Sequence, residues 1–126
     1  MALSNYLENA LLNATVRNTA YTSPATVYLA LYSTAPTSST SGTELTGSGY
    51  SRQAITFNAP SGGAVTSNVT VTFGPATSNW VPIIASAVLD ASTGGNILYF
   101  TSTVAQNVLS GSSLVIDGGN VSITLT

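Results

Sequence analysis

The chain contains no cysteine, histidine or lysine, and its only charged side chains are two arginines and four carboxylates among 126 residues. Without cysteine there is no disulfide, no thiolate nucleophile and no zinc–thiolate site. Without histidine or lysine there is no imidazole base, no Ser-His-Asp triad and no Schiff-base lysine. The side chains that most often carry catalysis are therefore absent.

The shortage of charge also limits the partners. Two arginines cannot neutralise the phosphates of a nucleic-acid footprint, and the net charge is −2, so we expect no nucleic-acid and no membrane partner. No stretch approaches the roughly 18 apolar residues of a spanning helix, and no basic start followed by an apolar core indicates a signal peptide. A surface of uncharged hydroxyl and amide groups repels other molecules weakly, which suits a subunit of a large assembly.

The four carboxylates are placed where structural roles explain them. Glu8 lies in a predicted helix start and Glu44 in a long polar loop, while Asp90 and Asp117 precede glycine-rich turns, where Asp bonds its own backbone. The two turns lack the ligand count and spacing of a calcium loop. We therefore expect no enzyme and no catalytic, cofactor or metal site.

Residues 3–14 are the only convincing helix, because apolar side chains recur there every three to four positions. Ser4 or Asn5 can cap its start, and Glu8 suits the first turn of the helix dipole. Arg17 falls just past the end, where the dipole favours a cation.

From residue 23 onward the apolar pattern changes to a period of two. In "TVYLALY" both alternating faces are apolar or aromatic, which suits a strand buried on two sides or one that meets another subunit. Seven segments have strand character: 26–32, 51–60, 67–73, 83–90, 97–104, 113–117 and 121–126.

The strand count and the regular turn signals predict an all-β fold. We expect a single antiparallel β-sandwich or jelly-roll-like domain over residues 23–126, preceded by an N-terminal helix or arm at residues 1–22. We also expect two hairpins, one joining 83–90 to 97–104 and one joining the last two segments.

Arg52 stands at the end of the polar loop 33–49, just before an alternating apolar segment. A guanidinium can hold one carboxylate or several carbonyls, so Arg52 can fix the return of the loop through Glu44, while Tyr50 packs and donates one hydrogen bond. Arginine and tyrosine are also favoured anchors between subunits. Both interpretations of Glu44, Tyr50 and Arg52 stay open.

Trp80 is the only tryptophan and precedes a predicted strand. Its indole could stack on a sugar, as in a lectin-like site, or it could belong to the core or to an interface.

Four stretches together resemble a family of small virion proteins of tailed bacteriophages, often labelled tail-fibre proteins. They are "LSNYLENALLNATVRNTAYTSPATVYLALYSTAP", "GTELTGSGYSRQAITFNAP", "NVTVTF" with "ATSNW", and "DASTGGNILYF". The resemblance covers nearly the full length, and it implies a virion structural protein made in the host cytoplasm.

On this resemblance, a small, nearly uncharged β-domain with an apolar arm looks like a capsid decoration (cement) protein. That reading implies a homotrimer on the outer surface of the phage head, with the major capsid protein as its partner. The alternative is a small tail, baseplate or fibre-tip component with a receptor- or glycan-binding role, in which Trp80 and the 33–49 loop would contact the receptor.

The decoration reading also predicts how the protein attaches. Leu3, Tyr6, Leu7 and Leu11 would form an apolar helix face that docks into a groove on the capsid or on a neighbouring subunit. Many copies would then clamp the shell through multivalency.

Overall fold

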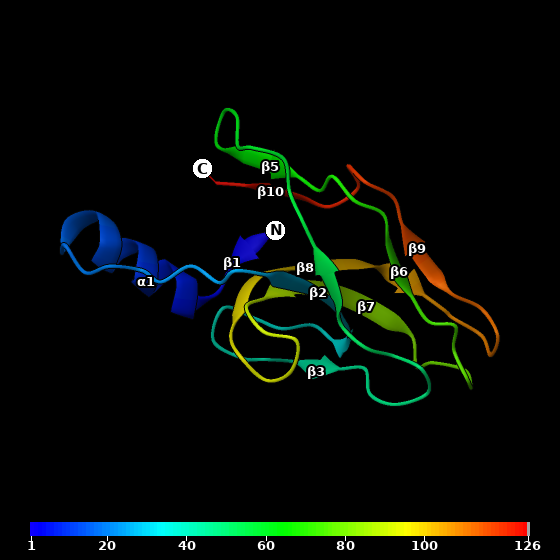
Figure 1. Ribbon diagram of the computed structural model, residues 1–126. Helices are drawn as coiled ribbons and strands as arrows, with labels where there is room; N and C mark the ends of the chain where they lie inside the picture. The colour runs from blue at the N-terminus through cyan, green and yellow to red at the C-terminus, as the bar shows by residue number, and fades with distance from the viewer. Residues whose placement is uncertain (126) are drawn as a thin grey trace.

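The main sheet is built around the strand that the "TVYLALY" alternation predicts, β2 (Val27–Thr34). The computed structural model describes residues 1–125, and Figure 1 shows β2 beside β7 (Ile83–Leu89), which pairs with β8 (Ile97–Gln106). Every pairing in this sheet is antiparallel. The remaining strands are short and lie at its margins: β1 (Ala2–Leu3) on β8, and β3 (Thr43–Glu44) and β4 (Gln53–Ile55) on β2.

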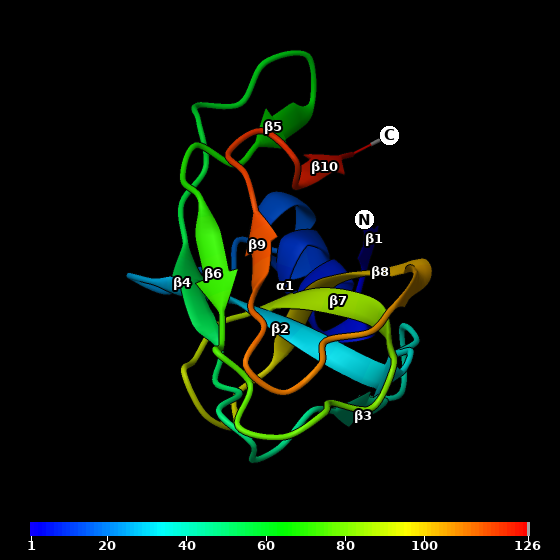
Figure 2. The same cartoon turned by 90° about the vertical axis from the view of Figure 1, so that its right-hand side faces the viewer.

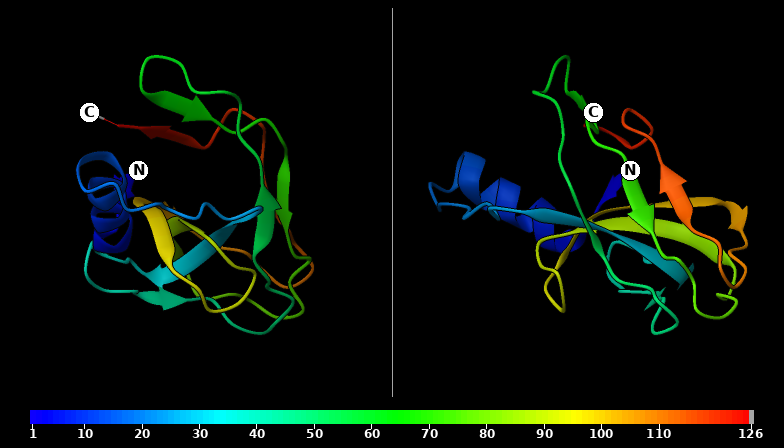
Figure 3. Two further views of the ribbon diagram at one scale, coloured as in Figure 1. Left: turned by 60° about the vertical axis from the view of Figure 1, so that its left-hand side comes forward. Right: turned by 45° about the vertical axis from the view of Figure 1, so that its right-hand side comes forward.

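Two small antiparallel sheets form the second layer. β5 (Ala64–Thr66) pairs with β10 (Ser122–Thr124), and β6 (Val71–Phe73) pairs with β9 (Leu114–Ile116). Both lie on the same side of the main sheet (Figures 1 and 3). The fold is therefore mostly antiparallel β with one N-terminal helix, which confirms the predicted fold class.

The predicted hairpin between 83–90 and 97–104 is confirmed by the pairing of β7 with β8. The predicted hairpin between the last two segments is wrong, because β9 and β10 pair with β6 and β5 instead. Thr126, the end of the last segment, lies outside the described residues.

Buried Ser67 explains why these last two strands separate. Its hydroxyl accepts the N–H groups of Gly119 and Val121, and its own N–H donates to the Val121 carbonyl at 2.8 Å. The turn between β9 and β10 is thus held against the segment between β5 and β6. As a result, β9 pairs with β6 on one side of the turn and β10 pairs with β5 on the other.

The main sheet is buried on both faces. Leu29 and Leu31 of β2 point into the larger core with Phe73 of β6, and Ala30 and Tyr32 point to the opposite face. The first face is covered by the small sheets, and the loops that follow β2 and β7 lie on the other side (Figure 1). The alternation read from the sequence is confirmed, and the second face is covered by loops of the same chain.

The helix α1 (Asn5–Val16) begins two residues later than predicted and reaches outward from the sheets (Figure 1), so that it lies behind them in the view of Figure 2. Ser4 is its N-cap: the Ser4 hydroxyl accepts the Leu7 N–H at 3.2 Å and donates to the Ile97 carbonyl. Residues before the cap form strand β1, so the first part of the expected arm belongs to the main sheet. A separate role for residues 1–22 stays a prediction.

Within the described part of the chain, α1 is far too short to cross a lipid bilayer, and no other helix is present there.

Candidate functional site

Arg52 closes the polar loop against its own sheet and against a second loop. Its Nε and one terminal nitrogen bind both oxygens of Glu44, at 2.9 and 2.8 Å. The other terminal nitrogen donates to the carbonyls of Ala91 and Gly94, at 2.8 and 2.7 Å. One side chain thus joins β3 to the turn between β7 and β8.

Tyr50 links this cluster to strand β2 and to the larger core. Its hydroxyl donates to Glu44 at 2.7 Å and accepts the Leu31 N–H at 3.0 Å. Its ring stacks on Phe73 and meets the Trp80 ring edge-on, with centroids 6.0 and 5.9 Å apart. The structure therefore brings Glu44, Tyr50 and Arg52 together within one chain, and an intersubunit role for them stays a prediction.

The environment of this cluster shifts four pKa values. Burial, followed by the hydrogen bond to Glu44, raises the pKa of Tyr50. Burial alone would raise the pKa of Glu44, but the hydrogen bonds from Arg52 and Tyr50 lower it below its usual value. The same bond to Glu44 raises the pKa of Arg52. Burial, followed by the nearby Glu44 charge, raises the pKa of Tyr32 to about 12. At neutral pH the cluster therefore consists of an ionised Glu44–Arg52 pair beside two neutral phenols, Tyr32 and Tyr50.

Trp80 is packed into the larger core and keeps 7% of its surface exposed. Its indole N–H donates to the Ser48 carbonyl at 2.8 Å, which ties it to the end of the polar loop. The indole therefore offers little open face to a sugar, and its packing matches the core interpretation.

The four side chains expected to dock from the helix do not share one exposed face. Leu3 belongs to β1, Leu7 is buried, Leu11 is half-buried and Tyr6 is exposed. Docking stays a prediction, and the most exposed large apolar side chains of α1 lie elsewhere on it, at Leu12 and Val16.

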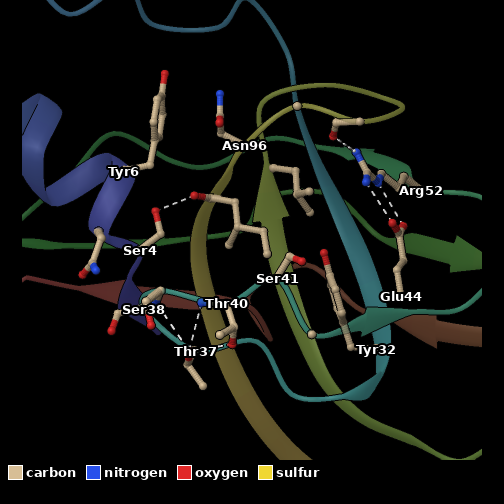
Figure 4. A pocket seen from close by; sticks show the side chains of 17 residues that line it. Ser4, Tyr6, Tyr32, Thr37, Ser38, Thr40, Ser41, Glu44, Arg52 and Asn96 are labelled. Carbon is tan, nitrogen blue, oxygen red and sulfur yellow. Dashed lines mark hydrogen bonds and ion pairs between the residues drawn. The ribbon is translucent and has the colours of Figure 1, made fainter.

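A cavity of about 580 Å³ opens between the start of α1, the loop after β2 and the turn after β7 (Figure 4). Glu44 and Arg52 form one wall, and Tyr32 of β2 lies beneath them. Residues 37–42 and 94–97 supply much of the rest. Sequence reasoning singled out Glu44, Arg52 and the loop, but it missed Tyr32 and the 94–97 turn.

The 90–96 turn has a fixed shape. Asp90 accepts the Asn96 backbone N–H at 2.7 Å and its side-chain amide at 3.2 Å. Gly95 has a φ of +72°, and a Cβ there would collide with the Asp90 carboxylate. This turn presents the Gly94 carbonyl to Arg52 and one wall to the cavity. Among residues 1–125, no three side chains of the types that usually bind metals lie close enough together to hold a metal ion.

A protein-family model described as podophage GP4 fiber I protein gp80 matches residues 2–124, nearly the whole chain. The chain belongs to this family. It is a fiber protein, a structural component of a phage virion. No curated protein matches it.

This fiber family confirms the virion resemblance in its coarse form. It supports the tail and fibre alternative better than capsid decoration, because the matched family is described as a fiber protein and not as a head protein. The cavity, the Arg52 cluster and the buried Trp80 are thus features of a fiber protein.

Proposed function

We propose that this fiber protein is a small, non-enzymatic tail, baseplate or fibre-tip unit that contacts a receptor on the host surface. The observation that carries the proposal is the family match, which spans residues 2–124 and is described as a fiber protein. The long loop after β2 and the turn after β7 supply the exposed polar surface that such a contact needs.

The composition supports a non-enzymatic role. The chain has no histidine, cysteine or lysine, and Glu44 is already bound to Arg52 and Tyr50. The contacts of this chain are therefore proposed to be physical, through packing and hydrogen bonding.

We further propose that copies of the chain associate as a homotrimer. β1 pairs with β8 only at Tyr99 and Phe100, so the outer edge of residues 101–106 has no strand partner among the described residues. This edge, "TSTVAQ", carries neither charge nor proline, the features that usually protect an open edge. Val104 on it is 83% exposed.

Capsid decoration is the second candidate. The small size, the low charge and the exposed apolar side chains of α1 favour a subunit that binds a shell, with the major capsid protein as partner. The description of the family favours the fibre reading over this one.

Immunogold electron microscopy of intact virions separates the two candidates. Antibody to this protein is expected to label the tail or its fibres, at a few to a few dozen copies. Label over the whole head would replace the fibre proposal with decoration. Virions opened with a mild denaturant are the control for hidden epitopes, and absence of label there as well would remove the virion assignment.

A further inference from the structure

The cavity beside Arg52 is lined by uncharged polar groups, by one neutralised pair and by the apolar side chains of Leu89 and Ile97. Serine and threonine residues of the 37–42 loop, Ser4, Asn5 and Asn96 surround it, and its charged groups, Glu44 and Arg52, bind each other. Its volume, about 580 Å³, lies in the range of small-molecule sites.

Tyr32 gives this cavity an unused hydrogen-bonding group. The side chain is 2% exposed, and its hydroxyl has no hydrogen-bond partner among the described residues. Every fully enclosed side-chain nitrogen or oxygen there has a partner, so the small exposed part of Tyr32 includes its hydroxyl. Figure 4 shows that hydroxyl between Ser41 and the Glu44–Arg52 pair. This accessible phenol can both donate to and accept from a ligand hydroxyl.

Four further groups extend the same surface. Oε1 of Glu44 accepts one hydrogen bond from Arg52 and has a second lone pair. Ser41 and Ser38 have no side-chain hydrogen bond among the described residues, and both line the cavity. Tyr6 stands at the rim with 44% of its surface exposed, and its ring offers an apolar face.

We propose that this cavity binds a neutral saccharide. Each sugar hydroxyl both donates and accepts, which matches the Tyr32 phenol, the free lone pair of Glu44 and the serine hydroxyls. The C–H face of a sugar ring fits against Tyr6. The inference rests on the proposed receptor-contacting role, and it moves the glycan contact from Trp80 to a site that the fold leaves open.

Other ligand classes fit less well. An anion would need a free cation, and Arg52 already donates four hydrogen bonds, to Glu44, Ala91 and Gly94. A cation would have to compete with Arg52 for Glu44. An apolar ligand would leave the hydroxyls of the lining without partners.

Saturation-transfer NMR and calorimetry on the purified chain test the proposal. The probes are D-glucose, D-galactose, L-rhamnose, N-acetyl-D-glucosamine, maltose and lactose at millimolar concentration, together with an array of neutral bacterial polysaccharides. The wild type is expected to bind at least one probe. Tyr32→Phe removes only the hydroxyl, so it is expected to weaken that binding about tenfold without lowering the melting temperature.

Two further variants locate the site. Tyr6→Ala is expected to weaken binding several-fold through loss of the rim contact. Tyr99→Phe is the matched control, since Tyr99 is half-buried on β8, does not line the cavity and is expected to bind like the wild type.

The proposal is overturned if the wild type binds no probe, or if Tyr32→Phe and Tyr6→Ala bind as the wild type does. Loss of fibre assembly in Tyr32→Phe, without saccharide binding by the wild type, would assign the cavity to a segment of another virion protein and also overturn it. Immunogold labelling reports independently where the protein lies on the virion. If the tail is labelled but the protein binds no saccharide, the saccharide inference fails and the fibre proposal stands.

Discussion

At the scale of single residues, the stability of the loop region depends on one guanidinium. Arg52 uses four hydrogen bonds to hold β3 and the 90–96 turn, and its side chain keeps 10% of its surface exposed. An exposed ion pair contributes little, but a shielded, bidentate pair with satisfied neighbours costs much more to break. The second arginine, Arg17, is exposed and reaches only Asn13, at 3.4 Å. The chain therefore supplies its own comparison.

Arg52→Ala is expected to lower the free energy of unfolding by about 2–4 kcal/mol, because Glu44 and two carbonyls lose their partner together. The melting temperature should fall by roughly 5–15 °C, measured by circular dichroism. Arg17→Ala is the control and should stay within about 0.5 kcal/mol of the wild type. If Arg52→Ala melts like the wild type but no longer forms oligomers, Arg52 is an intersubunit contact and not a loop anchor.

Glu44 predicts a dependence of stability on acid. Its pKa in the folded chain is lowered from 4.5, so it stabilises the fold fully above that value and loses this contribution as the pH falls through the lower, folded value. The difference in melting temperature between the wild type and Glu44→Gln is therefore expected to be largest near neutral pH and to shrink in acid. Glu8→Gln, an exposed carboxylate of α1, is the control. A difference that stays constant down to the acid transition would contradict this assignment.

At the scale of elements, local patterns were readable and distant pairings were not. The 83–90 and 97–104 hairpin follows from a short turn in which Asp90 bonds Asn96, and such a turn is visible in the sequence. The pairing of β9 with β6 and of β10 with β5 depends on the hydroxyl of buried Ser67, whose distant hydrogen-bond partners a local pattern does not predict. The alternation of apolar and polar residues predicts which side chains of a strand face the core, but it does not predict which strand lies beside it.

The candidate site shows the same division. The Glu44–Arg52 contact could be anticipated because Glu44 lies in the polar loop and Arg52 follows the end of that loop, eight positions later. The cavity could not, since Ser4, Tyr32 and Asn96 come from three separate elements and meet only in the folded chain. Tyr32 lies in the alternating segment 26–32, but whether its hydroxyl stays free depends on which loops cover that face of the strand.

The junction of α1 with the main sheet gives a prediction at this scale. Ser4→Ala removes both the cap of α1 and the bond to the Ile97 carbonyl, so the free energy of unfolding is expected to fall by about 1–3 kcal/mol. Urea unfolding measures this, and amide hydrogen exchange should be faster in the first turn of α1. Ser92→Ala, in the exposed turn between β7 and β8, is the matched control. Equal stability of the two variants would show that the cap contributes nothing measurable.

At the scale of the whole molecule, the open edge of β8 and the low charge act together. A net charge of −2 gives little electrostatic repulsion between copies. The outer edge of residues 101–106 has no strand partner among residues 1–125, and no charged side chain there blocks approach. A fibre requires repeated contacts between identical surfaces, and closed symmetry is the usual solution. The edge of β8 is therefore the surface at which we expect copies to meet.

Val104→Lys tests this edge. A lysine at the centre of an exposed edge strand opposes pairing with another strand, while the fold loses little because Val104 is already 83% exposed. Sedimentation velocity should show a trimer for the wild type and a shift toward monomer for Val104→Lys, with an unchanged melting profile for the monomer. Val16→Lys is the matched control: it makes the same change at a similarly exposed valine, 76% exposed on α1, and should leave the trimer intact. If Val16→Lys dissociates the oligomer and Val104→Lys does not, the copies meet through the helix, and the edge of β8 is free for another virion protein.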